Sequence, residues 1–250
     1  MTISLSAVII TYNEERNIER CLASLHGIAD EIVVVDSFSS DKTEEICQQH
    51  KVKFIQNKFE GHIQQKNFAI SCASNNWILS LDADEALSEE LRTSLINIKS
   101  RKDFNGYSMN RLTNYCGKWV KHCGWYPDTK IRLVHRDYAK WSGVNPHDKL
   151  EMNNGESTGF LIGDILHYSY YTQQDHLNQI EYFGGIASKE LFEKGAKSSW
   201  FKIIYKVIAQ FFKSYFLKLG FLDGKTGITI SRLSAYATYV KYHKLLRLKK

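Results

Sequence analysis

The first 85 residues of this chain alternate between short apolar runs and segments in which apolar residues recur with helical spacing. The runs are rich in β-branched residues, which is typical of strands buried on both faces of a sheet. Between the runs, apolar residues three or four positions apart indicate amphipathic helices. Strands that alternate with helices pair in parallel, so the sequence predicts an α/β, Rossmann-like fold with a doubly wound, mostly parallel sheet. The expected strands are residues 5–11, 31–36, 53–56 and 77–81.

The pattern changes after residue 101 and again near residue 170. Shorter, aromatic-rich strands are expected between these points, and helical spacing resumes from Thr172 onward. The organisation that we expect is an α/β domain over residues 1–170, with halves at 1–100 and 101–170, followed by a helical tail over 171–250.

The net charge of +6 originates in the C-terminal part of the chain. Acidic and basic residues are interspersed through residue 150, whereas the stretch from Lys189 to Lys250 has many Lys and Arg residues and few acidic ones. Such an excess suits nucleic acid, phosphate-bearing ligands or an anionic membrane surface. No recognised nucleic-acid-binding module is present in the sequence, so nucleic acid is not expected as a partner.

Three features of the sequence bear on the compartment. Five scattered cysteines without C-x-x-C spacing indicate reduced thiols. The N-terminus runs directly into the first strand without a basic n-region, so no signal peptide is expected. No apolar run approaches the roughly 20 residues of a spanning helix. We therefore expect a cytoplasmic protein, with any membrane contact peripheral and on the inner face of the cell membrane.

Two carboxylates follow the fourth expected strand, in the sequence Asp82-Ala83-Asp84. Ligands of parallel α/β sheets bind beyond the carboxyl ends of the strands, so these side chains are candidates for a binding site. In an extended chain residues i and i+2 share one face, which would let both carboxylates act together. Hard oxygen ligands with open positions suit Mg²⁺ or Mn²⁺, which would neutralise a departing diphosphate. The competing interpretation is a solvated turn that leads into a helix capped by Ser88.

Polar residues also follow the first two expected strands. Asp36 ends the second strand, where it could accept hydrogen bonds from a ribose or a base, or simply cap its own loop. The first strand is followed by Thr11-Tyr12-Asn13-Glu14, which contains no glycine. The G-x-G-x-x-G fingerprint of dinucleotide-binding folds is therefore absent, which argues against NAD and FAD.

Eight short motifs, four of them within the first 85 residues, carry a family resemblance. They are Val8 to Glu15, Ile32 to Ser37 with Ser40 to Thr43, Gln65 to Ala69, Leu81 to Glu85, Gly124 to Asp128, Ile131 to Leu133, Pro146 to Asp148, and Gly220 to Gly224. The first four resemble glycosyltransferase family 2, whose members have the GT-A fold. The later four are similar to the subgroup that contains lipopolysaccharide core glucosyltransferases. The resemblance implies an inverting hexosyltransferase that uses a UDP-sugar donor and a glycan or lipid-linked acceptor.

This resemblance also assigns roles to the candidate residues. It implies that residues 1–100 bind the nucleotide-sugar and residues 101–170 the acceptor, with Mn²⁺ or Mg²⁺ as cofactor. Asp84 would be the direct metal ligand, with Asp82 beside it. An arginine usually precedes the asparagine of the third helix in this pattern; here Lys66 stands there, so contact with the diphosphate would be monodentate. The residues expected around the nucleotide-sugar are Thr11, Tyr12, Glu14, Asp36, Lys66 and Asp82.

Inverting transfer needs one base to take the proton of the acceptor hydroxyl, a contribution of about 10²- to 10⁴-fold to the rate. The subgroup often has His-Glu where this chain has His147-Asp148. Asp148 is therefore the first candidate, although an aspartate reaches one methylene less far than a glutamate. Asp128, in the loop before Ile131, is the second candidate.

The basic tail contains an amphipathic segment at residues 201–219. At 100° per residue its apolar side chains fall on one arc, with Lys202, Lys206 and Lys213 opposite. One interpretation is a helix packed on the catalytic domain with a solvated lysine face. The other is docking to an anionic membrane surface, which would suit a lipid-linked acceptor. The arc contains Ile204, Val207, Ile208, Phe211, Phe212, Tyr215 and Leu219.

Two other functions compete with glycosyl transfer. A nucleotidyltransferase also binds nucleotides on an α/β sheet, but it would need a glycine- and arginine-rich phosphate loop after the first strand, which this sequence lacks. A catalytically silent sugar- or membrane-binding scaffold would not need Asp82, Asp84 and a candidate base. The sequence therefore favours the enzyme.

Overall fold

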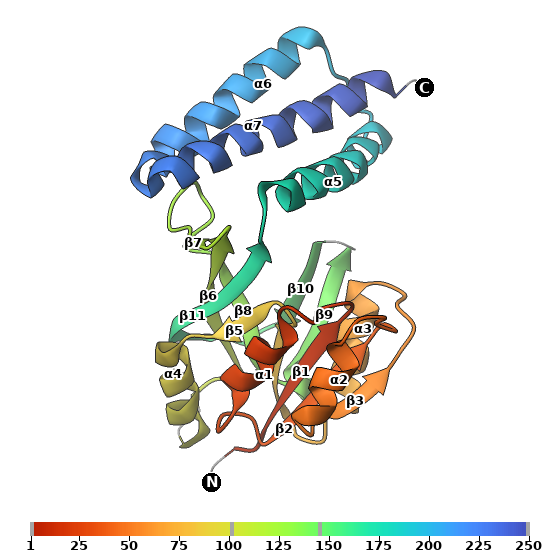
Figure 1. The fold of residues 1–250 in the computed structure, drawn as a ribbon, viewed down its shortest axis with the longest axis vertical. Helices are drawn as coiled ribbons and strands as arrows, with labels where there is room; N and C mark the ends of the chain where they lie inside the picture. Colours follow the sequence, from red (N-terminus) through yellow and green to blue (C-terminus); the bar gives the residue numbers. More distant parts are fainter. Residues whose placement is uncertain (1–2, 101–102, 145–146, 249–250) are drawn as a thin grey trace. The chain divides into compact units, whose positions relative to one another are not determined.

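The computed structural model describes residues 3–100, 103–144 and 147–248, so Pro146, Lys249 and Lys250 lie outside the described residues. The chain divides into two compact units (Figure 1). The sheet unit contains Met1–Arg111 and Asp128–His167, and the helical unit contains Leu112–Pro127 and Tyr168–Lys250.

The sheet has its four expected strands where the sequence predicts them. β1 (Leu5–Thr11) lies between β2 and β4 and runs parallel to both, and β3 is parallel to β2. The strand order is β3-β2-β1-β4-β8-β6-β11-β5, and beyond β4 it includes antiparallel pairings of β8 with β4, of β6 with β8 and of β5 with β11. The expected α/β fold is confirmed, and its parallel half is the half with helical crossovers. The other strands are β2 (Glu31–Asp36), β3 (Lys53–Gln56), β4 (Trp77–Asp82), β5 (Glu85–Leu87), β6 (Gly106–Tyr115), β8 (Thr129–His135) and β11 (Gly159–Tyr170).

Both faces of the parallel strands are covered, which explains their nearly continuous apolar sequences. In β1, Leu5, Ala7 and Ile9 pack in one cluster with residues of α1, α2 and α4. Val8 points the other way and packs in a second cluster with α3 and the β9-β10 hairpin. Because helices and the hairpin cover both faces, a ligand can reach these strands only at their carboxyl edge. The covering elements are α1 (Ile18–Leu25), α2 (Thr43–Gln49), α3 (His62–Cys72), α4 (Glu89–Ser100), β9 (Ala139–Val144) and β10 (His147–Met152), with η1 (Arg136–Tyr138) before β9.

The helical unit consists mainly of three long helices, in which α7 contacts both α5 and α6. Thr172 and Asp175 form a reciprocal capping box at the start of α5, and the Ser199 hydroxyl accepts a hydrogen bond from the Lys202 amide at the start of α6. Within the part of the chain that the structure describes, none of the helices combines the length and hydropathy that a membrane span needs. The elements are β7 (Lys118–Trp119), α5 (Gln173–Glu193), α6 (Trp200–Phe212), the π-helix η2 (Lys213–Leu217), η3 (Gly220–Asp223) and α7 (Gly224–Arg247).

The contact between β11 and the start of α4 requires a glycine. Gly163 has φ +103°, and a Cβ there would lie 2.6 Å from the Leu91 Cα and closer still to its backbone nitrogen. We expect Gly163→Ala to lower the free energy of unfolding by at least about 2 kcal/mol more than Gly155→Ala, measured by urea denaturation. Gly155 has a similar φ of +89° with open space around it, so this control isolates the clash from backbone strain. Equal losses in the two variants would contradict this explanation.

Candidate active site

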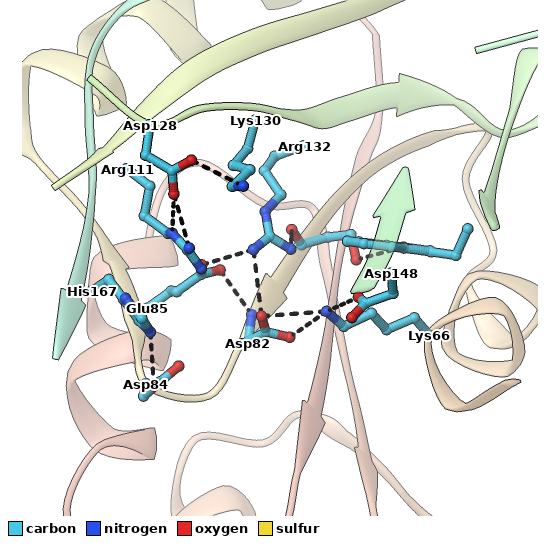
Figure 2. Close-up of polar contacts among 12 residues, drawn as sticks. Lys66, Asp82, Asp84, Glu85, Arg111, Asp128, Lys130, Arg132, Asp148 and His167 are labelled. Atoms are coloured by element: carbon cyan, nitrogen blue, oxygen red, sulfur yellow. Dashed lines mark hydrogen bonds and ion pairs between the residues drawn. The ribbon is translucent and has the colours of Figure 1, made fainter. Parts of the chain in front are cut away.

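A continuous row of ion pairs crosses the carboxyl edge of the central strands (Figure 2). Acidic and basic side chains alternate along it, so each charge has at least one opposite neighbour. The N–O distances are 2.8 Å for Asp148–Lys66, 3.0 Å for Lys66–Asp82, 3.3 Å for Asp82–Arg132, 2.8 Å for Arg132–Glu85, 3.6 Å for Glu85–Arg111, 2.8 Å for Arg111–Asp128 and 2.9 Å for Asp128–Lys130. The row therefore joins both candidate bases through Lys66 and Asp82.

The middle of this row is buried, because Glu85 and Arg132 lie almost entirely out of contact with solvent. Burial alone would lower the pKa of Arg132, but the carboxylates of Glu85 and Asp82 outweigh it and hold that pKa above its usual range. Burial alone would raise the pKa of Asp82, but Lys66 and Arg132 hold it well below its usual value. Asp82 and Arg132 are therefore charged together.

Trp141 of β9 forms one wall beside the row. The Lys66 ammonium lies 4.2 Å from its ring centroid, and the Arg132 guanidinium carbon lies 5.4 Å from it. The indole N–H donates to the Ser80 hydroxyl at 3.3 Å, which fixes the ring against β4. Cation–π attraction to the indole therefore adds to the ion pairs in holding both cations.

Asp82 and Asp84 have different partners. Asp82 ends β4 and contacts Lys66 and Arg132, whereas Asp84 lies in the turn before β5 and its Oδ2 is 3.1 Å from His167 Nε2. Burial alone would lower the pKa of His167, but the Asp84 carboxylate outweighs it and raises that pKa. Both carboxylate oxygens of Asp82 lie close to the Lys66 ammonium, Oδ1 at 3.0 Å and Oδ2 at 3.3 Å.

The loops after β1 and β2 are tied to each other. Asn13 has φ +55°; its amide donates to the Ser39 hydroxyl and its side-chain oxygen accepts from the Ser40 amide, each at 2.8 Å. Asp36 is fully buried, and both its carboxylate oxygens accept hydrogen bonds from Ser39. Asp36 therefore stabilises its own loop and keeps lone pairs for another donor. The left-handed backbone of Asn13 explains why α1 begins only at Ile18.

The expected nucleotide-contacting residues lie along these loops. Tyr12 is exposed, and the Thr11 hydroxyl is buried without a hydrogen-bond partner. Burial, together with the nearby carboxylates of Asp84, Asp41 and Asp82, outweighs the hydrogen bond from Asn17 and raises the pKa of Glu14 to about 7. The structure brings Glu14 and both carboxylates of the Asp82-Ala83-Asp84 turn within electrostatic range of one another.

The two candidate bases lie on opposite ends of the row of ion pairs. The Asp148 carboxylate, in β10, pairs with Lys66. The Asp128 carboxylate, directly before β8, pairs with both Arg111 and Lys130. Asp148 therefore lies next to the cation that also holds Asp82, whereas Asp128 is separated from Asp82 by Arg111, Glu85 and Arg132.

Several residues of the site carried no assignment from the sequence. One of them had a visible signal: Arg132 interrupts the apolar run of Ile131 and Leu133, which indicates a buried charge that needs a partner. Glu85 lies within the Leu81 to Glu85 motif but received no role there. The others come from distant strands, where no local pattern marks them; they are Arg111, Lys130, Trp141 and His167.

The donor groups around Asp84 fit a hard divalent cation. Among the described residues, no three His, Cys, Asp or Glu side chains form a complete metal-binding group. The Asp84 carboxylate and the imidazole beside it would instead supply part of a coordination shell that phosphate oxygens and water complete, as is common for Mg²⁺ and Mn²⁺.

A doubly covered α/β sheet with its charged groups gathered at the carboxyl edge is the arrangement of an enzyme that binds nucleotide ligands there. The chain belongs to glycosyl transferase family 2, because the model of that family matches residues 6–150. The expectation of a glycosyltransferase is thereby confirmed.

The relatives agree with this family. An uncharacterized glycosyltransferase of Rickettsia bellii is 30% identical over 258 residues, covering 99% of this chain and 88% of its own. The lipopolysaccharide core biosynthesis glycosyltransferase LpsC of Rhizobium meliloti is 25% identical over 256 residues, covering 95% and 93%. Among solved structures, residues 1–349 of S. aureus TarS in complex with UDP-GlcNAc give a TM-score of 0.49 at 15% identity, covering 97% of this chain and 89% of that chain.

Removal of the central cation should destabilise the fold. Arg132→Met leaves Asp82 and Glu85 without their shared partner, so we expect the free energy of unfolding to fall by about 3 to 5 kcal/mol. Lys130→Met, at the partly exposed end of the row, should cost less than about 1 kcal/mol. Urea denaturation of both variants measures the difference, and similar small losses would contradict the proposed dependence on Arg132.

Glu14 should make stability depend on pH. Its folded pKa of about 7 exceeds the ordinary value of 4.5, so the unfolded chain ionises first as the pH rises. Stability is therefore fully present below about pH 4.5 and is lost as the pH rises through about 7, by about 2 to 3 kcal/mol in total. Glu14→Gln should remove this part of the profile, as measured by urea denaturation across that range. The exposed control Glu45→Gln should leave the profile unchanged.

Proposed function

We propose that this glycosyltransferase moves a sugar, expected to be a hexose, with inversion from a UDP-sugar to an acceptor hydroxyl in the presence of Mn²⁺ or Mg²⁺. The observation that carries the proposal is the link Asp148–Lys66–Asp82, which places a candidate base beside the carboxylates at the nucleotide edge of the sheet. Group transfer needs the base that activates the acceptor and the groups that bind the donor to lie close to each other.

The loops after β1 and β2 are the proposed nucleotide site. Tyr12 is exposed and offers a ring for stacking on a base, while the unpartnered Thr11 hydroxyl and the remaining lone pairs of Asp36 are suited to ribose or base hydrogen bonds. Glu14 lies near the Asp82 and Asp84 carboxylates, where a bound cation would favour its charged form. The hydrogen bonds between the two loops hold this surface ready before the donor binds.

Asp84 and Asp82 are the proposed metal residues, and we add His167 because its imidazole contacts Asp84. A bound cation there would neutralise negative charge on the departing diphosphate. Lys66 offers one ammonium group to the same diphosphate. Its contacts with the Asp82 and Asp148 carboxylates hold this cation at the edge of the sheet.

Asp148 is the proposed base. The acceptor hydroxyl gives its proton to the Asp148 carboxylate, its oxygen forms a bond to the anomeric carbon, and the bond between that carbon and the diphosphate breaks to release UDP. Asp128 remains the second candidate; its carboxylate pairs with two cations, Arg111 and Lys130.

The proposed acceptor is a glycan or a lipid-linked sugar, in the synthesis of lipopolysaccharide core or another cell-surface glycan. The similarity to LpsC along nearly the whole chain supports this acceptor class. The proposed place of action is the cytoplasmic side of the cell membrane, with peripheral contact.

Two substitutions separate donor binding from proton transfer. Asp84→Ala should abolish the Mn²⁺-dependent heat of UDP binding together with transfer. Asp148→Asn should retain UDP binding while transfer falls about 10²- to 10⁴-fold. The control Asp137→Asn changes an exposed carboxylate and should alter neither. If Asp128→Asn causes the large loss and Asp148→Asn does not, the base is Asp128.

The donor is tested by calorimetry with UDP-glucose, UDP-galactose and other activated sugars in the presence of Mn²⁺. Binding of at least one UDP-sugar, followed by UDP release when an acceptor is added, is the expected result. Binding of UDP-sugars without release with any acceptor would favour the catalytically silent scaffold.

A further inference from the structure

The helix α6 presents a large apolar face to solvent. Phe201 is 83% exposed, Tyr205 62% and Ile208 64%, and the spacing of three or four residues places such side chains on one side of the helix. We call this the α6 apolar face; it consists of Phe201, Ile204, Tyr205, Ile208, Phe212 and, in η2, Phe216.

Packing within the helical unit does not use this face. The opposite side of α6 buries Ile203, and the helix contacts α7. The six side chains of the α6 apolar face remain exposed although the helix already has its partner. Several large apolar side chains gathered on one surface in this way mark an interaction site.

The charge around this face is of one sign. From Lys197 to Lys250 the sequence has twelve Lys and Arg residues and a single acidic residue, Asp223. That carboxylate is occupied by His122, whose backbone N–H donates to one oxygen at 2.9 Å and whose ring nitrogen lies 2.7 Å from the other. Lys206 and Lys213 are also exposed on this helical segment, between the face and the side that buries Ile203. The partner of this surface is therefore apolar and negatively charged.

A second copy of the chain fits these requirements poorly. Pairing two such faces by a twofold axis would bring the same lysines together without acidic residues to neutralise them. An anionic lipid surface supplies both requirements, since its acyl region accepts aromatic and aliphatic side chains and its headgroups attract lysines. At 13 residues, α6 is long enough to lie along the membrane surface and too short to span the bilayer.

We propose that the α6 apolar face docks onto the surface of an anionic membrane, with Phe201, Ile208 and Phe212 inserted among the lipids and Lys206 and Lys213 against the headgroups. This gives the expected peripheral contact a defined surface. It goes beyond the proposed glycosyl transfer and does not require the donor or the base to be assigned correctly.

The test is flotation of the full-length protein with vesicles of phosphatidylcholine alone and with about 30% phosphatidylglycerol. The wild type should bind the anionic vesicles, and Phe201→Ser/Ile208→Ser should bind them about 100-fold more weakly, because each buried side chain contributes about tenfold. The matched control Phe160→Ser/Ile162→Ser, which removes two similarly exposed side chains from the sheet unit, should bind within about twofold of the wild type. Lys206→Glu/Lys213→Glu should weaken binding to anionic vesicles by at least about tenfold.

Four outcomes would overturn the docking proposal: no binding by the wild type, equal binding by Phe201→Ser/Ile208→Ser, an equal loss in the control, or unchanged binding by the lysine variant. Sedimentation in solution tests whether a second copy of the chain covers this face instead. A wild-type protein that is dimeric and does not bind vesicles, with a monomeric Phe201→Ser/Ile208→Ser variant, would make the face a self-association surface. Release of UDP from a soluble donor, which the variant should retain, is measured on the same samples. If the wild type releases no UDP, the glycosyl transfer proposal is contradicted, and the vesicle result is unaffected.

Discussion

The buried charges at the carboxyl edge of the sheet constrain the rest of the structure, because none of them could be buried alone. Glu85 and Arg132 lie among apolar strands, and each would cost several kcal/mol without its opposite neighbour. Their pairing requires that β8, which carries Arg132, aligns along β4 so that Arg132 reaches Glu85 at the start of β5. The strands beyond β4 are therefore held to the parallel strands both by the backbone hydrogen bonds of β4 with β8 and by compensation of charge.

The same row connects stability with the candidate chemistry. Lys66 joins Asp82, at the end of β4, to Asp148 in β10, so the cation proposed for the diphosphate also positions the proposed base. The nucleotide loops are organised differently, through the hydrogen bonds of Asn13 and Asp36. A rigid polar rim beside a row of buried charges is a preorganised setting for a charged donor.

The helical unit follows another principle. Its helices bury one side and leave the α6 apolar face exposed in a segment that is almost without acidic residues. Such a surface is costly in water unless something covers it, and its charge selects an anionic partner. The proposed donor site in the sheet unit and the proposed docking surface in the helical unit thus depend on separate sets of residues, which lets each be tested without the other.

The sequence by itself determined the α/β class, the positions of the parallel strands and the polar residues at their ends, because these follow from local periodicity and from motifs within one strand and one loop. Only the tertiary structure joined Arg132 to Glu85, Trp141 to Lys66 and His167 to Asp84, since these pairs depend on which distant strands and helices become neighbours. It likewise decided that the α6 apolar face meets solvent, whereas Val207, Phe211 and Tyr215 of the arc expected from the sequence are half-buried, because helical periodicity defines a face without saying what that face contacts.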